Sequence, residues 1–144
     1  MEGKVVIVTG ASRGIGRVIC LKFAKAGATI ACCAPEADPP DNTVAEIIAA
    51  GGKAKGYLMD VTNSEQVDSV FDTITKELGT PAVLVNNAGI TRDGLLIRMK
   101  DEDWDKVLAV NLRGAFICTR AITKTMMKAR YGRIVNITSV NGMR

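Results

Sequence analysis

The chain has 144 residues, with 19 Lys or Arg against 15 Asp or Glu, a net charge of +4, four cysteines and no histidine. Its 47% hydrophobic and 24% charged residues are typical of one globular domain spanning residues 1–144, and they exclude a disordered, collagen-like or disulfide-dense chain. The sequence predicts no membrane, nucleic-acid or metal partner, because no apolar run reaches about 18 residues, no basic patch contains interleaved aromatic residues, and histidine is absent.

The first predicted elements alternate between strand and helix. The β-branched run 5–8 predicts a strand that is buried on both faces, and apolar residues at helical spacing then predict a helix that ends at Gly27. The short apolar run 29–33 predicts a second strand, and three prolines predict a loop over 35–41. A second helix is predicted over 43–50.

The later segments continue this alternation. A third strand is predicted over 55–59, and Asn63 is expected to cap the helix that follows it. The inward face of that helix is apolar: Val67, Val70, Phe71, Ile74 and Leu78. A fourth strand over 82–85, a long helix over 101–129 and a fifth strand over 133–138 complete the pattern. Such an alternation with short connections predicts an α/β fold, a doubly wound parallel sheet with helices on both faces.

Small and polar residues gather where the predicted strands end. Ligands bind outside the carboxyl ends of the strands in an open parallel sheet, at the point where the strand order reverses. Five strand ends carry such residues: Gly10–Gly16, Cys33–Pro35, Asp60–Val61, Asn86–Gly89 and Ser139. A packing role does not require small and polar residues at all five places, so we expect the functional site at this edge.

The turn between the first strand and the first helix is rich in glycine and reads T-G-A-S-R-G-I-G over residues 9–16. Glycine lets the backbone turn tightly and lets a pyrophosphate approach the positive N-terminus of the helix. The turn therefore predicts a nucleotide site made by Gly10, Ser12, Arg13, Gly14, Ile15 and Gly16. The alternative is a turn that serves packing alone.

Several motifs, in the same order along the chain, resemble the short-chain dehydrogenase/reductase family. The glycine turn has its spacing, Asp60-Val61 resembles its adenine-contacting pair, and residues 86–89 read Asn-Asn-Ala-Gly, like its fourth strand end. Asn111 and Ser139 stand where the family has a helix asparagine and a catalytic serine. The resemblance covers the whole chain. It implies a Rossmann fold whose further cofactor contacts are Asp60, Val61, Asn87, Ala88 and Gly89.

The stretch 90–100, followed by Trp104 and Asn111-Leu112, is similar to the 3-oxoacyl-[acyl-carrier-protein] reductases of fatty-acid synthesis. This resemblance implies NADPH-dependent reduction of a ketone to the 3-hydroxy product, with an acyl carrier protein or acyl thioester as partner. It also implies that Ser139 hydrogen-bonds the substrate oxygen and that Asn111 holds a relay water. The alternative for Ser139 is a serine that ends a strand in a turn, and the alternative for Asn111 is a satisfied polar group at a helix irregularity. A reductase that acts on another ketone is the alternative for the substrate.

The family's Tyr-x-x-x-Lys motif, which supplies the proton, does not occur in the printed sequence. Tyr57 and Tyr131 are followed four residues later by Val61 and Val135, and the family places the motif about a dozen residues after the serine, whereas Arg144 is the last residue. The sequence thus resembles the amino-terminal part of a reductase, and we expect it to be inactive alone. A non-catalytic nucleotide-binding or oligomerising module is the alternative.

The choice between the two nicotinamide cofactors depends on the end of the second strand. An acid there favours NAD, but this position is Ala34, and Glu36 and Asp38 lie later in the loop. Arg13 could pair with a 2′-phosphate through its several donors. The sequence therefore favours NADP(H) over NAD(H), with a solvated arginine as the alternative.

The four cysteines, Cys20, Cys32, Cys33 and Cys118, have apolar flanks and no metal-ligand spacing. They predict buried, reduced thiols, and with an N-terminus unlike a signal or transit peptide they favour a cytoplasmic protein.

The long helix 101–129 is apolar all round, which predicts burial against a second subunit and hence a homo-oligomer, a dimer or tetramer. Basic residues at its end are either ordinary helix-end cations or a docking surface for an acidic carrier protein: Lys124, Lys128, Arg130 and Arg133.

Overall fold

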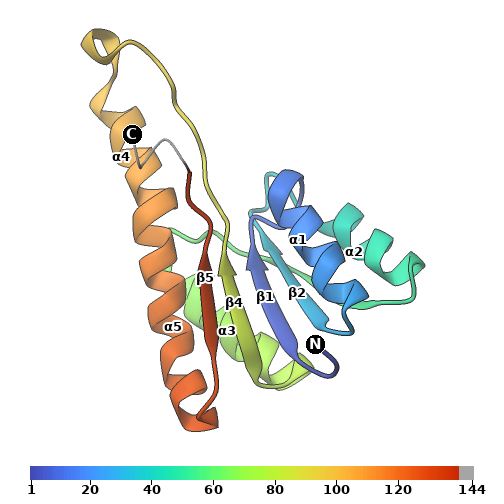
Figure 1. Ribbon diagram of the computed structural model, residues 1–144. Coiled ribbons are helices and arrows are strands. Elements are labelled where there is room, and N and C mark those ends of the chain that lie inside the picture. Colours follow the sequence, from blue (N-terminus) through green and yellow to red (C-terminus); the bar gives the residue numbers. More distant parts are fainter. Residues whose placement is uncertain (140–144) are drawn as a thin grey trace.

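A computed structural model describes residues 1–139 and places five strands in one parallel sheet (Figure 1). The strands are β1 (Val5–Thr9), β2 (Thr29–Ala34), β3 (Lys53–Leu58), β4 (Pro81–Asn86) and β5 (Arg133–Asn136). Their order in the sheet is β3-β2-β1-β4-β5, and every neighbouring pair is parallel. The order reverses between β1 and β4, so these strands flank the switch point at which doubly wound sheets bind ligands. The predicted fold class is confirmed.

Helices cover both faces of the sheet, α1 and α2 on one side and α3 and α5 on the other (Figure 1). Their bounds are α1 (Gly14–Lys25), α2 (Asp41–Ala49), α3 (Ser64–Leu78), α4 (Asp101–Leu108) and α5 (Gly114–Ala129), with a 3-10 turn η1 (Leu96–Arg98). In β1, Val6 and Val8 pack with α1 and α2, whereas Val5 and Ile7 pack with α3 and α5. Two helical layers therefore bury both faces of this strand, as its continuous apolar run predicts.

Helix α3 follows the sequence-based expectation closely. The side-chain oxygen of Asn63 accepts a hydrogen bond from the Gln66 N–H at 3.1 Å, which caps the helix. One face of α3 is buried against the sheet through Val67, Phe71 and Ile74. On the same face, Val70 and Leu78 are partly buried, as the apolar spacing predicts.

The predicted helix over 101–129 has the expected bounds, and it contains a π-helical turn at its centre. The chain passes from α4 through a π-helical turn, η2 (Ala109–Arg113), into α5. Two contacts hold this turn: the Asn111 side chain bonds to the backbone of Ile90, and Gly114 packs so closely that a Cβ would lie 2.7 Å from Cγ2 of Val61. Contacts with residues distant in sequence produce the irregularity, so helical spacing alone does not reveal it.

Within residues 1–139, strand β5 has a partner on one edge only, where it pairs with β4. The apolar side chains of Ile134 and Val135, and of Ile137 directly after the strand, stay 39–42% exposed, as at an open sheet edge. The four cysteines are buried and free, which confirms the predicted thiols. No helix within residues 1–139 is long and apolar enough to cross a bilayer.

Candidate functional site

The carboxyl ends of β1 and β4 are joined by the hydroxyl group of Thr9, which is 1% exposed. Its oxygen accepts hydrogen bonds from the backbone N–H groups of Asn87 and Ala88, each at 3.0 Å, and the hydroxyl donates to the Val85 carbonyl at 3.4 Å. A hydroxyl has one donor and two acceptor sites, so Thr9 uses its full capacity here. The two strands on either side of the switch point are thereby held together where they end.

The Asn87 side chain extends this connection to the glycine turn. Its Nδ2 donates to the carbonyl oxygens of Thr9 at 3.0 Å and Gly10 at 3.1 Å. Gly10 has φ +64°, and a Cβ there would lie 2.9 Å from the Ala88 Cα. A Cβ on Gly16 would overlap the Gly10 carbonyl oxygen. Glycine is therefore required at both positions, and the turn, the start of α1 and residues 87–88 form one close-packed unit.

The N-terminus of α1 is open to an anion. No side chain caps it and no acidic residue lies in its first turn among the described residues. Gly14, the first helical residue, has φ +55° and nothing within 4 Å of the place where a Cβ would be. Free backbone N–H groups and the positive end of the helix dipole favour phosphate at such a place. These residues fit the pyrophosphate of a dinucleotide, the group that the glycine turn predicts.

A loop after β2 packs against this turn. The Ser12 hydroxyl donates to Oδ2 of Asp38 at 2.8 Å, and Nε of Arg13 pairs with the same oxygen at 3.0 Å. The Thr43 hydroxyl donates to the Ala11 carbonyl at 2.8 Å. Sequence reasoning selected Ser12 and Arg13 and noted Asp38 in the loop, but it missed Thr43 and the contact of Asp38 with the turn, because no local pattern indicates contacts between residues 26 and 32 positions apart.

Asp60 and Val61 lie at the end of β3. Oδ1 of Asp60 accepts hydrogen bonds at 2.8 Å from both the N–H and the hydroxyl of Thr62, and the Asp60 N–H donates to Oε1 of Gln66 at 2.7 Å. Val61 is 7% exposed and packs against Gly114. The local bonds fix the backbone of both residues at the same edge of the sheet as the glycine turn.

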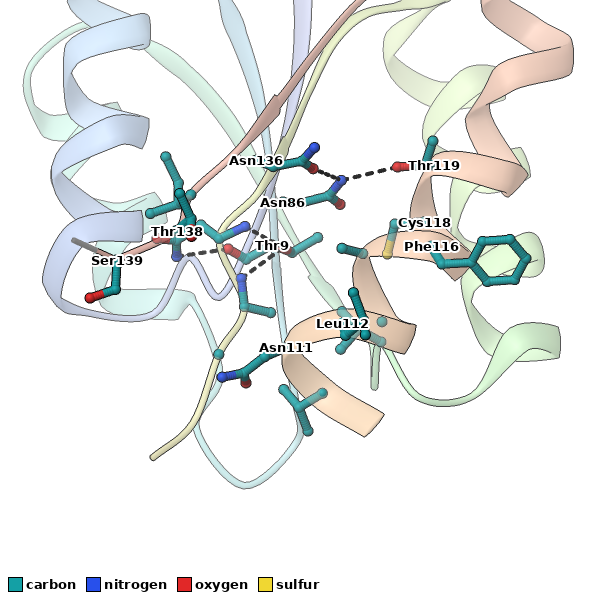
Figure 2. Close-up of a pocket in the computed structure, with 18 residues that line it drawn as sticks. Thr9, Asn86, Asn111, Leu112, Phe116, Cys118, Thr119, Asn136, Thr138 and Ser139 are labelled. Atoms are coloured by element: carbon teal, nitrogen blue, oxygen red, sulfur yellow. Dashed lines mark hydrogen bonds between the residues drawn. The ribbon is translucent and has the colours of Figure 1, made fainter. Parts of the chain in front are cut away.

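A cavity of about 640 Å³ lies beside the switch point (Figure 2). Its walls come from the ends of β1, β4 and β5, the turn η2 and the start of α5. Six of the predicted site residues line it: Val61, Asn87, Ala88, Gly89, Asn111 and Ser139. The others lie outside its lining: Gly10, Ser12, Arg13, Gly14, Ile15, Gly16 and Asp60. The structure thus separates a glycine-turn region from a cavity, and Asn87 contacts both.

Asn111 holds the π-helical turn against the segment that follows β4. Its Oδ1 accepts from the Ile90 N–H at 2.8 Å, and its Nδ2 donates to the Ile90 carbonyl at 3.0 Å. Both ends of the amide are therefore occupied by one residue's backbone. This arrangement fixes where residues 87–90 lie in the cavity wall, and the predicted relay of a water stays a prediction.

A buried side-chain amide, that of Asn86, also lines the cavity. Nδ2 of Asn86 donates to Oδ1 of Asn136 at 2.8 Å and to the Thr119 hydroxyl at 3.1 Å, which connects β4 to β5 and α5 (Figure 2). Asn86 is 6% exposed, and its Oδ1 has no hydrogen-bond partner among the described residues. Sequence analysis marked Asn86 as part of a motif but gave no sign of Thr119 and Asn136.

The cavity lining is nearly free of titratable groups. Cys118 is the one such side chain among the described lining residues, and burial raises its pKa to about 12, so its thiol is neutral at pH 7. Both tyrosines lie elsewhere. The Tyr57 hydroxyl donates to Glu77 at 2.7 Å, and burial raises the Tyr57 pKa, while the Tyr131 ring lies under the ammonium group of Lys4. Within residues 1–139, the cavity lining offers no acid that could protonate a substrate oxygen at neutral pH.

The predicted basic docking surface lies at the other edge of the molecule. Helix α5 ends at Ala129 and β5 begins at Arg133, at the bottom of Figure 1, whereas the strands end and the glycine turn lies at the top. A carrier protein bound to Lys124 or Lys128 would be separated from Ser139 by the length of β5. The structure therefore places the basic residues away from the cavity.

Comparison with known proteins identifies the family to which this arrangement of strands, glycine turn and cavity belongs. A profile of the short chain dehydrogenase family matches residues 4–144. The chain is 48% identical over 144 residues to a 3-oxoacyl-[acyl-carrier-protein] reductase of Synechocystis and 44% identical over 141 residues to one of Escherichia coli. These matches cover 99% and 98% of this chain but only 58% and 57% of the relatives, so the chain spans less than two thirds of their length.

Solved structures give the same result. A short-chain dehydrogenase/reductase from Burkholderia xenovorans superimposes with a TM-score of 0.94 at 34% identity, covering 99% of this chain and 56% of that one. A metagenomic short-chain oxidoreductase in complex with NADP has a TM-score of 0.92 at 37% identity, covering 99% and 65%. Both agree with the doubly wound fold described above.

The central hydroxyl of Thr9 leads to a test of stability. Thr9→Val keeps the shape of the side chain but leaves the N–H groups of Asn87 and Ala88 without an acceptor, so we expect a loss of about 1–3 kcal/mol in the free energy of unfolding. Thr9→Ser keeps the oxygen and should lose about 1 kcal/mol or less. Urea unfolding measures both. Equal stability of the two variants would contradict the role given to the hydroxyl.

Proposed function

The chain belongs to the short-chain dehydrogenase family, and from this premise we propose that it forms the cofactor-binding part of an NADPH-dependent 3-oxoacyl-[acyl-carrier-protein] reductase. The whole enzyme would reduce the 3-oxo group of a carrier-bound acyl chain to a 3-hydroxy group. The observation that carries the proposal is the open N-terminus of α1, packed against Asn87 at the switch point of the sheet. The names of the Synechocystis and Escherichia coli relatives support the substrate, and the NADP complex of the metagenomic relative supports the cofactor.

The proposed cofactor contacts follow the carboxyl edge of the sheet. The backbone N–H groups at the start of α1, from Gly14 to Gly16, would hold the pyrophosphate, and Asp60 with Val61 would contact the adenine. Residues 87–89 would border the nicotinamide half, next to the cavity. When bound, NADPH supplies the hydride, so the protein has to orient the ketone and provide a proton.

Two residues of the cavity would act on the substrate side. We propose that the Ser139 hydroxyl hydrogen-bonds the ketone oxygen and stabilises the charge that develops on it. Asn111 would act as a positioning residue, because its amide holds the Ile90 backbone and so the 87–90 wall. The neutral lining of the described residues leaves the proton donor to a group outside them.

We further propose that two copies of the chain associate through helices α4 and α5. An apolar stripe with a spacing of four residues is exposed along these helices and the turn η2 between them: Trp104, Leu108, Leu112 and Phe116, at 56%, 40%, 67% and 58%. The opposite side of α5 is buried on the sheet through Ile117, Ile122 and Met126. A contiguous exposed apolar surface of this kind is typical of a protein interface, and an identical stripe on a second copy would cover it.

Nucleotide binding is tested at Gly14. Replacing it with Asp places a carboxylate beside the proposed pyrophosphate site, and we expect NADPH affinity to fall by roughly tenfold or more. Gly51→Asp is the matched control, because Gly51 also has a positive φ (+81°) and nothing within 4 Å of the Cβ position, but lies between α2 and β3. Fluorescence titration with NADPH measures both variants. Equal affinity of the two would contradict the phosphate site.

A turnover assay of the 144-residue chain distinguishes a cofactor-binding part of a reductase from a complete enzyme. We expect NADPH to bind, but we expect no NADPH consumption with an acetoacetyl thioester, because the described cavity lacks a proton donor. Loss of NADPH absorbance measures the rate, and binding in the same sample controls for folding. Turnover that disappears in Ser139→Ala would contradict the expectation, since the chain would then hold a complete site.

Association is tested on the apolar stripe. Light scattering of the wild-type chain should give a mass above the 15.3 kDa of one copy, and Leu108→Lys should lower it. Ile48→Lys introduces the same charge at a 56% exposed residue of α2 and should leave the mass unchanged. A wild-type chain that stays monomeric at all concentrations would refute the interface.

A further inference from the structure

The glycine turn already holds an anion of the protein itself. The Ser12 hydroxyl and the Arg13 guanidinium both contact Oδ2 of Asp38, at 2.8 and 3.0 Å. Asp38 lies four residues beyond Ala34, the last residue of β2, and the loop brings it back over the turn. These donors, Ser12 and Arg13, are the ones next to the end of β2, where the adenosine ribose of a dinucleotide binds in doubly wound folds.

The position of Asp38 does not depend on the ion pair alone. Its backbone N–H donates to the Pro35 carbonyl at 3.0 Å, which closes a turn, and the two prolines that follow restrict the chain up to α2. At the start of α2, the Thr43 hydroxyl donates to the Ala11 and Ser12 carbonyls at 2.8 and 3.1 Å. The loop thus contains an internal turn and is tied to the glycine turn at the start of α2, and this keeps the Asp38 carboxylate beside Ser12 and Arg13.

We propose that Asp38 is a specificity-determining residue that competes with the 2′-phosphate of NADP(H) for Ser12 and Arg13 and so narrows the preference for NADP(H) over NAD(H). This inference rests on the proposed function, because it assumes that a nicotinamide dinucleotide binds at the glycine turn. It adds that the donors suited to a 2′-phosphate are partly neutralised by a carboxylate of the same chain.

The two cofactors differ at this carboxylate. A phosphate monoester carries a charge of about −1.5 to −2 at pH 7, so it repels Asp38 and has to take its place on Arg13. A ribose 2′-hydroxyl is neutral and can donate a hydrogen bond to a carboxylate. Asp38 therefore opposes NADP(H) and tolerates or assists NAD(H).

The exposure of the pair limits the size of this effect. The Arg13 side chain is 85% exposed and that of Asp38 43%, so solvent screens the ion pair and its displacement by a phosphate is easy. The remaining penalty is the repulsion between two nearby anions. We expect it to be worth roughly fivefold to tenfold in affinity for NADP(H).

The test compares Asp38→Asn with Glu36→Gln in the 144-residue chain. Glu36 belongs to the same loop, is exposed, and makes no hydrogen bond or ion pair within the described residues, so it controls for the loss of one negative charge. Affinities for NADP+ and NAD+ are measured by calorimetry, and circular dichroism verifies folding. Asp38→Asn should bind NADP+ roughly fivefold to tenfold more tightly, with NAD+ affinity unchanged or lower, whereas Glu36→Gln should match the wild type.

A double-mutant cycle with Arg13→Ala tests whether Asp38 changes the NADP+ affinity through Arg13. Arg13→Ala alone should lower the affinity for NADP+ more than the affinity for NAD+. Adding Asp38→Asn to Arg13→Ala should raise the NADP+ affinity less than Asp38→Asn does in the wild type. Asp38→Ala, which removes the carboxylate and its hydrogen-bonding atoms together, should also raise the NADP+/NAD+ affinity ratio.

The inference about Asp38 is overturned if the NADP+/NAD+ affinity ratio is unchanged in Asp38→Asn, or if it shifts equally in Glu36→Gln. In either case, nucleotide binding by the wild type still upholds the glycine-turn site. A wild-type chain that binds neither NADP+ nor NAD+ overturns the proposed function and this inference together.

Discussion

Strands β1 and β4 lie side by side at the switch point, but the chain leaves them in different directions, one into a glycine turn and one into an extended segment. The buried hydroxyl of Thr9 and the side-chain amide of Asn87 hold the two ends together through five hydrogen bonds between 3.0 and 3.4 Å. Everything else in the candidate site depends on this connection. These bonds set the positions of the glycine turn and the N-terminus of α1 relative to the wall of the cavity.

The site consists of two parts with different electrostatic character. At the glycine turn, an uncapped helix N-terminus and the guanidinium of Arg13 provide positive potential suited to phosphate groups. Next to it, the cavity is lined by amides, hydroxyls and apolar groups, and Cys118 is neutral there. This difference suits a reaction in which a charged cofactor is held at one place and an uncharged ketone reacts at the next.

Much of this arrangement can be predicted from the sequence, where the signal is local. The apolar run of β1 and the Asn63 cap of α3 each act within a few residues, and the structure has them as the pattern indicates. The π-helical turn at Asn111 and the contact of Asp38 with Ser12 depend on partners 21 and 26 residues away, so no local pattern contains them. The Asn86–Asn136 bond, across 50 residues, is of the same kind.

The central claim is that a dinucleotide binds along the carboxyl edge of the sheet. Backbone amide NMR spectra of the isotope-labelled chain, titrated with NADP+, test it most directly because every residue reports separately. The account predicts shifts for residues 10–16, 60–61 and 87–89, with none around the hollow between α5 and β5 lined by Met126, Arg130 and Ile134. Shifts confined to that hollow, or a glycine turn that does not respond at saturating NADP+, would contradict it.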